Sequence, residues 1–255
     1  MPAELHVFTC LSDNIGVLFR DASTGACASI DAPEAPPIVA ALDEKGWKLT
    51  DILVTHRHGD HVGGVEELKR RYKARVVAPA QEAGSIPAVD VAVKEGDKVL
   101  VGSLGGKVIA TPGHTAGHIA YYFEGAKALF AGDTLFALGC GRVFEGSHGD
   151  MWQSLQKLAA LPDDTRLYCG HEYTLANARF ALAVDPGNAA LKLRAAVVEG
   201  TRADGRLTIP SMMGEEKTTN PFLRATDPAI ARRVGKEVSD PVAVFTALRE
   251  WKNRF

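Results

Sequence analysis

The chain has 255 residues, of which 46% are hydrophobic, enough to bury a full core in one large domain or two smaller ones. Its 29 basic and 31 acidic residues leave a formal net charge of −2, which excludes a bulk field that would attract nucleic acid or an anionic membrane. Four widely spaced cysteines without a CxxC pair argue against a disulfide framework and a thiolate zinc knuckle, and they indicate a reducing compartment.

The N-terminal segment does not have the pattern of a secretory signal. It carries Glu4 and then Ser12, Asp13 and Asn14 where an apolar region would lie, and no later stretch approaches membrane-spanning length. We therefore expect a cytoplasmic protein, a monomer, with no nucleic-acid partner and no membrane partner.

Short β-rich runs alternate with turn residues through the first two thirds of the chain, which predicts strands at 17–19, 51–54, 74–77, 107–110 and 128–131. Apolar residues at helical spacing lie between some of these runs and predict helices at 36–45, 62–72 and 149–161. The alternation is typical of an α/β protein.

From about Tyr173 onward the apolar spacing becomes helical and strand-like runs disappear. It predicts helices at 176–184, 189–199 and 242–251, joined through an ordered loop over the polar stretch 202–224. We therefore expect two domains, residues 1–172 as an α/β domain and residues 173–255 as a C-terminal helical domain.

Four potential metal ligands crowd into the segment T-H-R-H-G-D-H, directly after an apolar run: His56, His58, Asp60 and His61. Imidazole and carboxylate together suit zinc, iron or manganese, and the lack of a ligating cysteine argues against a closed structural zinc site. Asp60 alone would be interpreted as a helix N-cap, but the three histidines around it favour a ligand.

Three further candidate ligands follow later apolar strands and stand beside glycines: His114, Asp133 and His171. Loops at the carboxyl ends of strands are where layered α/β proteins gather functional groups. Seven nitrogen and oxygen ligands exceed one four-coordinate ion but fit two ions about 3.5–4 Å apart, for which hydrolysis is the default chemistry. A histidine in a glycine-rich turn is otherwise a hydrogen-bonded scaffold residue, and His118 is interpreted in that way.

The segment T-H-R-H-G-D-H resembles the T-H-x-H-x-D-H signature of the metallo-β-lactamase superfamily. Further blocks resemble the hydroxyacylglutathione hydrolases (glyoxalase II) of that superfamily and span nearly the whole chain, at 11–14, 111–118, 132–136, 139–142, 170–173 and 220–224. The ligand box specifies fold and metal but not substrate, because other hydrolases share it; the C-terminal blocks indicate the particular family.

The resemblance implies a four-layer αββα metallo-β-lactamase sandwich for residues 1–172, followed by a helical substrate-binding domain. It also implies two divalent ions, most simply Zn²⁺, with Fe or Mn as alternatives. One ion would be held by His56, His58 and His114 and the other by Asp60, His61 and His171, with Asp133 bridging them.

The implied activity is hydrolysis of S-D-lactoylglutathione to glutathione and D-lactate through a metal-bridging hydroxide, the second step of methylglyoxal detoxification. Asp60 would orient that hydroxide as the catalytic residue. A thioester suits such a site because the tetrahedral oxyanion is stabilised by the metals and the thiolate leaves with little protonation.

Positions that match the family's substrate contacts are Arg142, Tyr173, Arg249 and Lys252. The last two would lie on one face of a helix, where pattern alone indicates an ordinary solvated face. Arg142 stands where lysine is expected and Phe144 where tyrosine is expected; the first change alters the donor geometry and the second removes a hydroxyl, so both bear on glutathione affinity.

Other reaction classes remain open at this stage. A mononuclear-iron glutathione persulfide dioxygenase would use the same scaffold with three ligands, and metal count distinguishes it from the hydrolase. A phosphodiesterase or RNA-processing nuclease is disfavoured because the chain lacks a basic, aromatic-interleaved stripe. Asp31 is equally well interpreted as a turn residue or as a support for a ligand.

Overall fold

A computed structural model of the chain describes residues 3–255, which form two compact units. The first unit runs to Ala110 and also contains Thr115–Gly132, whereas the second comprises Thr111–His114 and Asp133–Phe255. No helix among the described residues is long and apolar enough to cross a membrane. The boundary expected after residue 172 stays a prediction.

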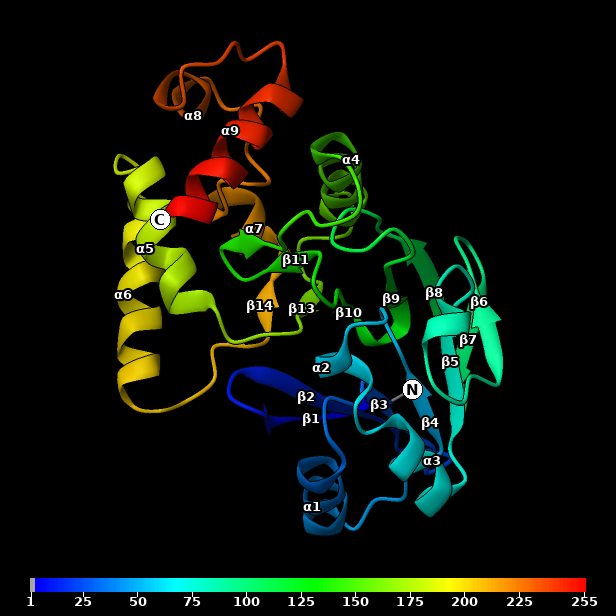
Figure 1. Cartoon of the computed structure of the whole chain (residues 1–255). Helices are drawn as coiled ribbons and strands as arrows, with labels where there is room; N and C mark the ends of the chain where they lie inside the picture. Colours follow the sequence, from blue (N-terminus) through cyan, green and yellow to red (C-terminus); the bar gives the residue numbers. More distant parts are fainter. Residues whose placement is uncertain (1–2) are drawn as a thin grey trace. The chain divides into compact units, whose positions relative to one another are not determined.

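The first unit contains a six-stranded mixed sheet whose strands follow sequence order (Figure 1). The antiparallel half is formed by β1 (Ala3–Cys10), β2 (Asn14–Asp21) and β3 (Cys27–Ile30). The parallel half continues from β3 through β4 (Asp51–Leu53), β5 (Arg75–Pro79) and β6 (Val91–Val93). Every residue of β4 is buried, as expected of a parallel strand that is covered on both faces.

An antiparallel set of four strands in the same unit packs against this sheet. It consists of β7 (Lys98–Val101), β8 (Leu104–Ala110), β9 (Ile119–Phe123) and β10 (Ala128–Phe130). The Phe19 ring of β2 lies 4.6 Å from the Phe123 ring and 5.3 Å from the Phe130 ring, measured between centroids. The Tyr121 hydroxyl donates to the Val54 carbonyl oxygen at 2.8 Å. These contacts form the core of a β-sandwich.

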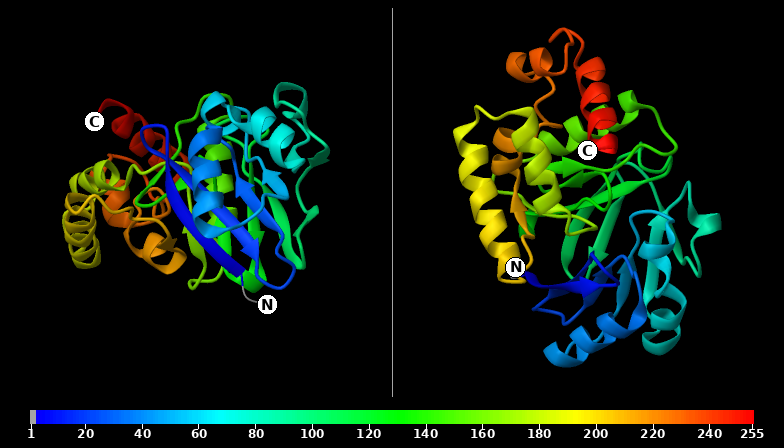
Figure 2. Two further views of the ribbon diagram at one scale, coloured as in Figure 1. Left: turned by 90° about the horizontal axis from the view of Figure 1, so that it is seen from below. Right: turned by 60° about the vertical axis from the view of Figure 1, so that its left-hand side comes forward.

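Helices α1 (Ala35–Lys45), α2 (Gly59–Val62) and α3 (Val65–Tyr72) belong to the first unit, as do the short 3-10 turns η1 (Ala83–Ser85) and η2 (Glu124–Ala126). Side chains from α1 and α3 share a buried core with the mixed sheet, and the two helices lie beside it in both views of Figure 2. The prediction of one continuous helix at 62–72 is wrong, because the helix is interrupted at Gly63 and Gly64. A Cβ on either glycine would lie 2.7 Å from backbone atoms of the Pro33–Ala35 segment.

The second unit contains a two-stranded hairpin, β11 (Leu135–Phe136) and β12 (Gly139–Cys140), and helix α4 (His148–Ala159). Strand β13 (Arg166–Tyr168) pairs antiparallel with β14 (Ser211–Met212). The predicted C-terminal helices form, and α5 and α6 pack through a small apolar core that includes Leu138. The helices are α5 (Thr174–Val184), α6 (Ala189–Ala203), α7 (Met213–Thr219), α8 (Pro228–Arg233) and α9 (Pro241–Arg254).

The loop expected at 202–224 is wrong, because this stretch contains β14 and α7. The buried positions of α7 are Met213, Glu216 and Thr219, so two of its three inward-facing side chains are polar. A search for apolar periodicity misses such a helix, since its buried face is stabilised by hydrogen bonds instead of hydrophobic burial.

Candidate active site

The first four candidate ligands gather on the loop after β4 and on α2. His56 Nε2 and His58 Nδ1 are 3.0 Å apart, and His61 Nε2 lies 3.6 Å from Asp60 Oδ2. His56 and His61 are almost completely buried. Ligand atoms around a tetrahedral ion with bonds of 2.0–2.1 Å are about 3.3 Å apart, so both spacings fit ligands that share an ion. Asp60 lies inside the first turn of α2, and the N-cap is His58.

Asp31 orients two of these histidines. Its carboxylate accepts hydrogen bonds from Thr55 N at 2.7 Å, Thr55 Oγ1 at 2.8 Å and His61 Nδ1 at 2.8 Å. The Thr55 hydroxyl donates its proton to Asp31 and can therefore accept one from His56 Nδ1, 3.0 Å away. We assign both rings the tautomer that leaves Nε2 as the lone-pair atom. This is how carboxylates orient metal-binding histidines.

Sequence reasoning left Asp31 between a turn residue and a support, and its three hydrogen bonds favour the support. Its φ of 54° is uncommon for a residue other than glycine, although aspartate tolerates it better than most. The only signal in the sequence was an aspartate directly after the apolar strand β3.

Replacing Asp31 by asparagine is expected to weaken metal binding by about 10- to 100-fold. Asparagine tolerates the same backbone conformation. Its side-chain NH2 is a donor, however, and would face groups that now donate hydrogen bonds to the Asp31 carboxylate. Competition with a chromophoric chelator measures the affinity. Asp90→Asn, which changes a carboxylate that bonds Val76 N and Lys69 in the same unit, is the matched control. Equal affinity in the two variants would contradict the supporting role.

A second cluster lies within the second unit and joins His114, Asp133 and His171. Asp133 Oδ2 is 3.4 Å from His114 Nε2 and 3.3 Å from His171 Nε2, and all three side chains are buried. His114 Nδ1 donates to the Arg142 carbonyl oxygen at 2.9 Å, which leaves Nε2 as the lone-pair atom. A single carboxylate oxygen this close to two imidazole nitrogens fits a ligand shared by two ions.

The donors of both clusters are imidazole nitrogens and carboxylate oxygens, which fit a divalent ion such as zinc.

The cysteines are free and buried. Burial raises the pKa of the Cys169 thiol to about 12 and that of Cys140 to about 11, despite the opposing effect of Arg249 on Cys140. Both are therefore neutral thiols near pH 7, which suits packing and not nucleophilic attack.

Three cations gather beside the hairpin. Arg249 is only 4% exposed; its Nη1 donates to the Cys140 carbonyl oxygen at 2.7 Å, and its guanidinium lies 5.1 Å from the Phe222 ring centroid. Burial, together with the charges of Arg249 and Arg142, lowers the pKa of Lys252 to about 8. Within residues 3–255, no carboxylate forms an ion pair with any of the three. Such a cluster fits an anionic ligand.

Aromatic rings flank the second cluster. Tyr173 stacks on His171 with centroids 4.8 Å apart and a 3° interplanar angle, and it is 39% exposed. The Phe136 ring meets both rings nearly edge-on. Phe144 is 61% exposed and its centroid lies 5.2 Å from that of His114, so the position where tyrosine was expected presents an apolar ring. His118 is buried in the first unit beside His56, at 4.9 Å between ring centroids.

Comparison with known proteins defines the class. The family model of the metallo-β-lactamase superfamily matches residues 24–171. Among solved structures, ETHE1 from Myxococcus xanthus has a TM-score of 0.68 and 27% identity, covering 96% of this chain and 90% of that one. The BLEG-1 B3 metallo-β-lactamase has a TM-score of 0.66 and 20% identity, covering 87% and 99%, and shows the fold alone. The predicted fold class, an αββα metallo-β-lactamase fold with a C-terminal helical region, is confirmed.

Further comparisons place the chain in one family within this superfamily. The model described as the hydroxyacylglutathione hydrolase C-terminus matches residues 172–255. Proteins named hydroxyacylglutathione hydrolase from Rhodopseudomonas palustris (strain BisA53) and Methylobacterium sp. (strain 4-46) are 61% and 60% identical, over 100% and 99% of both chains. The one from Nitrobacter winogradskyi is 57% identical over 100% of both. The chain therefore belongs to the hydroxyacylglutathione hydrolase family, as its sequence blocks predicted.

Proposed function

We propose that the chain hydrolyses the thioester bond of S-D-lactoylglutathione to give glutathione and D-lactate, the second step of methylglyoxal detoxification. The observation that carries this proposal is that a member of this family has a His/Asp donor cluster in each unit and a cationic cluster, Arg142, Arg249 and Lys252, with which no carboxylate of residues 3–255 forms an ion pair. The donors fit divalent ions, and the cations fit the two carboxylates of glutathione.

The seven donors are proposed to hold two ions, zinc in the simplest case, with one ion on His56, His58 and His114, the other on Asp60, His61 and His171, and Asp133 shared. When bound, such ions supply hydroxide near neutral pH and polarise the thioester carbonyl. Family membership supports this division, as do the 3.3–3.4 Å spacings around Asp133 and the tautomers that Asp31 and the Arg142 carbonyl impose.

Asp60 is proposed to orient the attacking water. Asn14 Nδ2 donates to the Asp60 main-chain oxygen at 3.0 Å and to its Oδ2 at 3.2 Å. This clamp holds the carboxylate in one direction while the side chain stays partly exposed. A fixed acceptor at hydrogen-bonding distance from water is what orientation of the nucleophile requires.

Arg142, Arg249 and Lys252 are proposed to bind the carboxylates of glutathione, and Tyr173 to contact its peptide. The cation charges that lower the pKa of Lys252 would instead be neutralised by a bound carboxylate, which supports an anion as the natural occupant. The Phe144 ring presents an apolar surface beside His114 but has no hydroxyl, so it cannot donate a hydrogen bond to the substrate.

Substrate capture is expected to weaken as pH rises through about 8, the lowered pKa of Lys252. Below this pH the ammonium is charged and attracts a carboxylate; above it the free enzyme holds a neutral amine. We expect kcat/KM, which reports groups of the free enzyme, to fall about tenfold on the alkaline side. Lys252→Arg stays charged and should remove this limb, whereas the same limb in both proteins would assign it to another group.

The persulfide dioxygenase remains the second candidate, and the number of ions bound per chain distinguishes it from the hydrolase. The whole-chain match to hydrolase relatives and the cations Arg249 and Lys252 of α9 favour the hydrolase. A cytoplasmic location, a monomeric state and the absence of a nucleic-acid partner are proposed together with this function, in keeping with the charge balance and the free cysteines.

Turnover of S-D-lactoylglutathione by purified protein of known metal content tests the function. Thioester loss and free thiol should appear together, and a chelator should abolish both. About two ions per chain with rapid hydrolysis is the expected result. Absence of hydrolysis by fully metallated protein, together with oxygen uptake on glutathione persulfide, would overturn the proposal in favour of the dioxygenase.

A further inference from the structure

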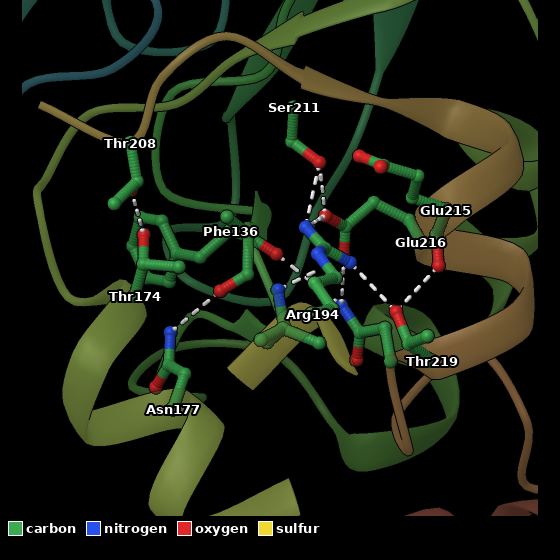
Figure 3. A network of polar contacts seen from close by, with 12 residues as sticks. Phe136, Thr174, Asn177, Arg194, Thr208, Ser211, Glu215, Glu216 and Thr219 are labelled. Atoms are coloured by element: carbon green, nitrogen blue, oxygen red, sulfur yellow. Dashed lines mark hydrogen bonds and ion pairs between the residues drawn. The ribbon is translucent and has the colours of Figure 1, made fainter. Parts of the chain in front are cut away.

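A buried polar network surrounds the β11–β12 hairpin and centres on Glu216 of α7 (Figure 3). Glu216 is fully buried, and its carboxylate accepts hydrogen bonds from four donors. Oε1 pairs with the Arg194 guanidinium and accepts from Ser211 Oγ, whereas Oε2 accepts from Leu138 N at 2.9 Å and from Asn220 Nδ2 at 3.0 Å. The carboxylate therefore has one side on α6 and β14 and one side on the hairpin.

The hairpin side of the network holds the backbone at several points. Asn220 Nδ2 also lies within hydrogen-bonding distance of the Phe136 and Gly139 carbonyl oxygens, at 3.2 and 3.0 Å. Asn177 donates to the Ala137 carbonyl oxygen at 3.1 Å. Leu138 has a φ of 58°, a strained conformation for a leucine. The hydrogen bond that Leu138 N–H donates to Glu216 helps to retain that conformation.

The same hairpin connects groups of the candidate site. It begins two residues after Asp133, and its Cys140 carbonyl oxygen accepts from Arg249 at 2.7 Å. The Phe136 ring packs edge-on against the rings of His171 and Tyr173. A shift of the hairpin backbone would thus move the acceptor that holds Arg249 as well as the ring that supports Tyr173.

We propose that Glu216 is a positioning residue for glutathione recognition, which it serves by fixing the Leu135–Cys140 hairpin and, through the Cys140 carbonyl, the Arg249 guanidinium. This inference rests on the proposed function, because it takes Arg249 as a contact for the carboxylates of glutathione. Glu216 itself touches no substrate. Its effect is on the direction in which a buried cation is held.

Glu216→Gln is the direct test because it keeps the side-chain volume. Since all four partners are donors, the glutamine amide must face at least one of them. Two readouts are required. Amide hydrogen exchange of the peptide that contains Leu138 is expected to accelerate by about tenfold. The Kd for S-methylglutathione, a conjugate that has no thioester to hydrolyse, is expected to rise by about tenfold in calorimetric titration of the metallated protein.

A double-mutant cycle with Arg249→Ala separates positioning from general loosening. In the Arg249→Ala protein, Glu216→Gln should raise the Kd by less than about twofold, because the group through which it acts has gone. A full tenfold rise in that background would overturn the proposal. Faster hairpin exchange with an unchanged Kd would overturn it equally.

Two control variants address stability. Asp185→Asn removes a partly exposed carboxylate that pairs with Arg224 in the same unit, and Ser211→Ala removes a donor from the Oε1 side of Glu216. Both should lower Tm without changing the Kd. If Glu216→Gln does not accumulate as folded protein, Asn220→Ser tests the hairpin side with the same readouts and the same overturning results. If the wild-type protein binds S-methylglutathione but does not hydrolyse S-D-lactoylglutathione, the proposed function is contradicted and this inference stands.

Discussion

Replacement of Asp60 by alanine is expected to lower kcat by about 10²- to 10⁴-fold, the range typical of a group that manages the proton of the nucleophile. Asn14 donates to the Asp60 main-chain oxygen and to its Oδ2, so the carboxylate is held in place, and alanine leaves no acceptor at that position. Steady-state kinetics with matched metal content measure the effect.

Arg249→Ala provides the contrast for Asp60→Ala. Arg249 is proposed to bind a carboxylate that is unchanged during the reaction, so its removal should raise KM with a much smaller effect on kcat. Glu66→Ala, an exposed change on the neighbouring α3, should behave as wild type. A pattern in which Asp60→Ala affects mainly KM while Arg249→Ala abolishes kcat would reverse the proposed roles.

Asp133→Asn is expected to reduce bound metal from about two ions to about one per chain and kcat/KM by about a thousandfold. Asparagine keeps the shape of the side chain, but its single carbonyl oxygen is a weaker ligand than the carboxylate oxygen that lies 3.3–3.4 Å from two histidine nitrogens. Elemental analysis after gel filtration, with kinetics on the same sample, measures both quantities.

The matched control for Asp133→Asn is Asp150→Asn. Asp150 belongs to the capping box of α4, where Ser147 holds the pKa of its carboxyl below the usual value. Its replacement should cost stability, which far-UV circular dichroism during heating would detect, but no metal. An Asp133→Asn protein that retained two ions and wild-type turnover would show that Asp133 is not the shared ligand.

Local sequence patterns predicted five strands and six helices, because the signals of these elements are local. Helices α5, α6 and α9 and the strands near the ligand box lie where hydrophobic periodicity placed them. The errors arose where a distant segment decides the outcome. The predicted helix is interrupted at Gly63 and Gly64, where the Pro33–Ala35 backbone lies 2.7 Å from the place that a Cβ would take, and α7 was missed because Glu216 and Thr219 face inward.

The candidate site shows the same division. Spacing and residue type were enough to select His56, His58, Asp60 and His61, because four ligands in six positions are chemically distinctive. Asp31 could not be distinguished from a turn residue, since its role depends on a hydrogen bond to a histidine 30 positions away. The sequence pattern placed Arg249 on a solvated helix face. Only its contacts with Phe222 and the Cys140 carbonyl in the structure show that it is buried.

By itself, the sequence determined the class of chemistry, the family and the positions of several strands and helices, because ligand type, spacing and periodicity are encoded over a few residues. Only the tertiary structure decided which tautomers the histidines adopt, which cations lose their solvent and what holds the hairpin between Asp133 and Arg142. Those properties depend on burial and on hydrogen bonds between residues that are far apart in the chain, and no local pattern contains them.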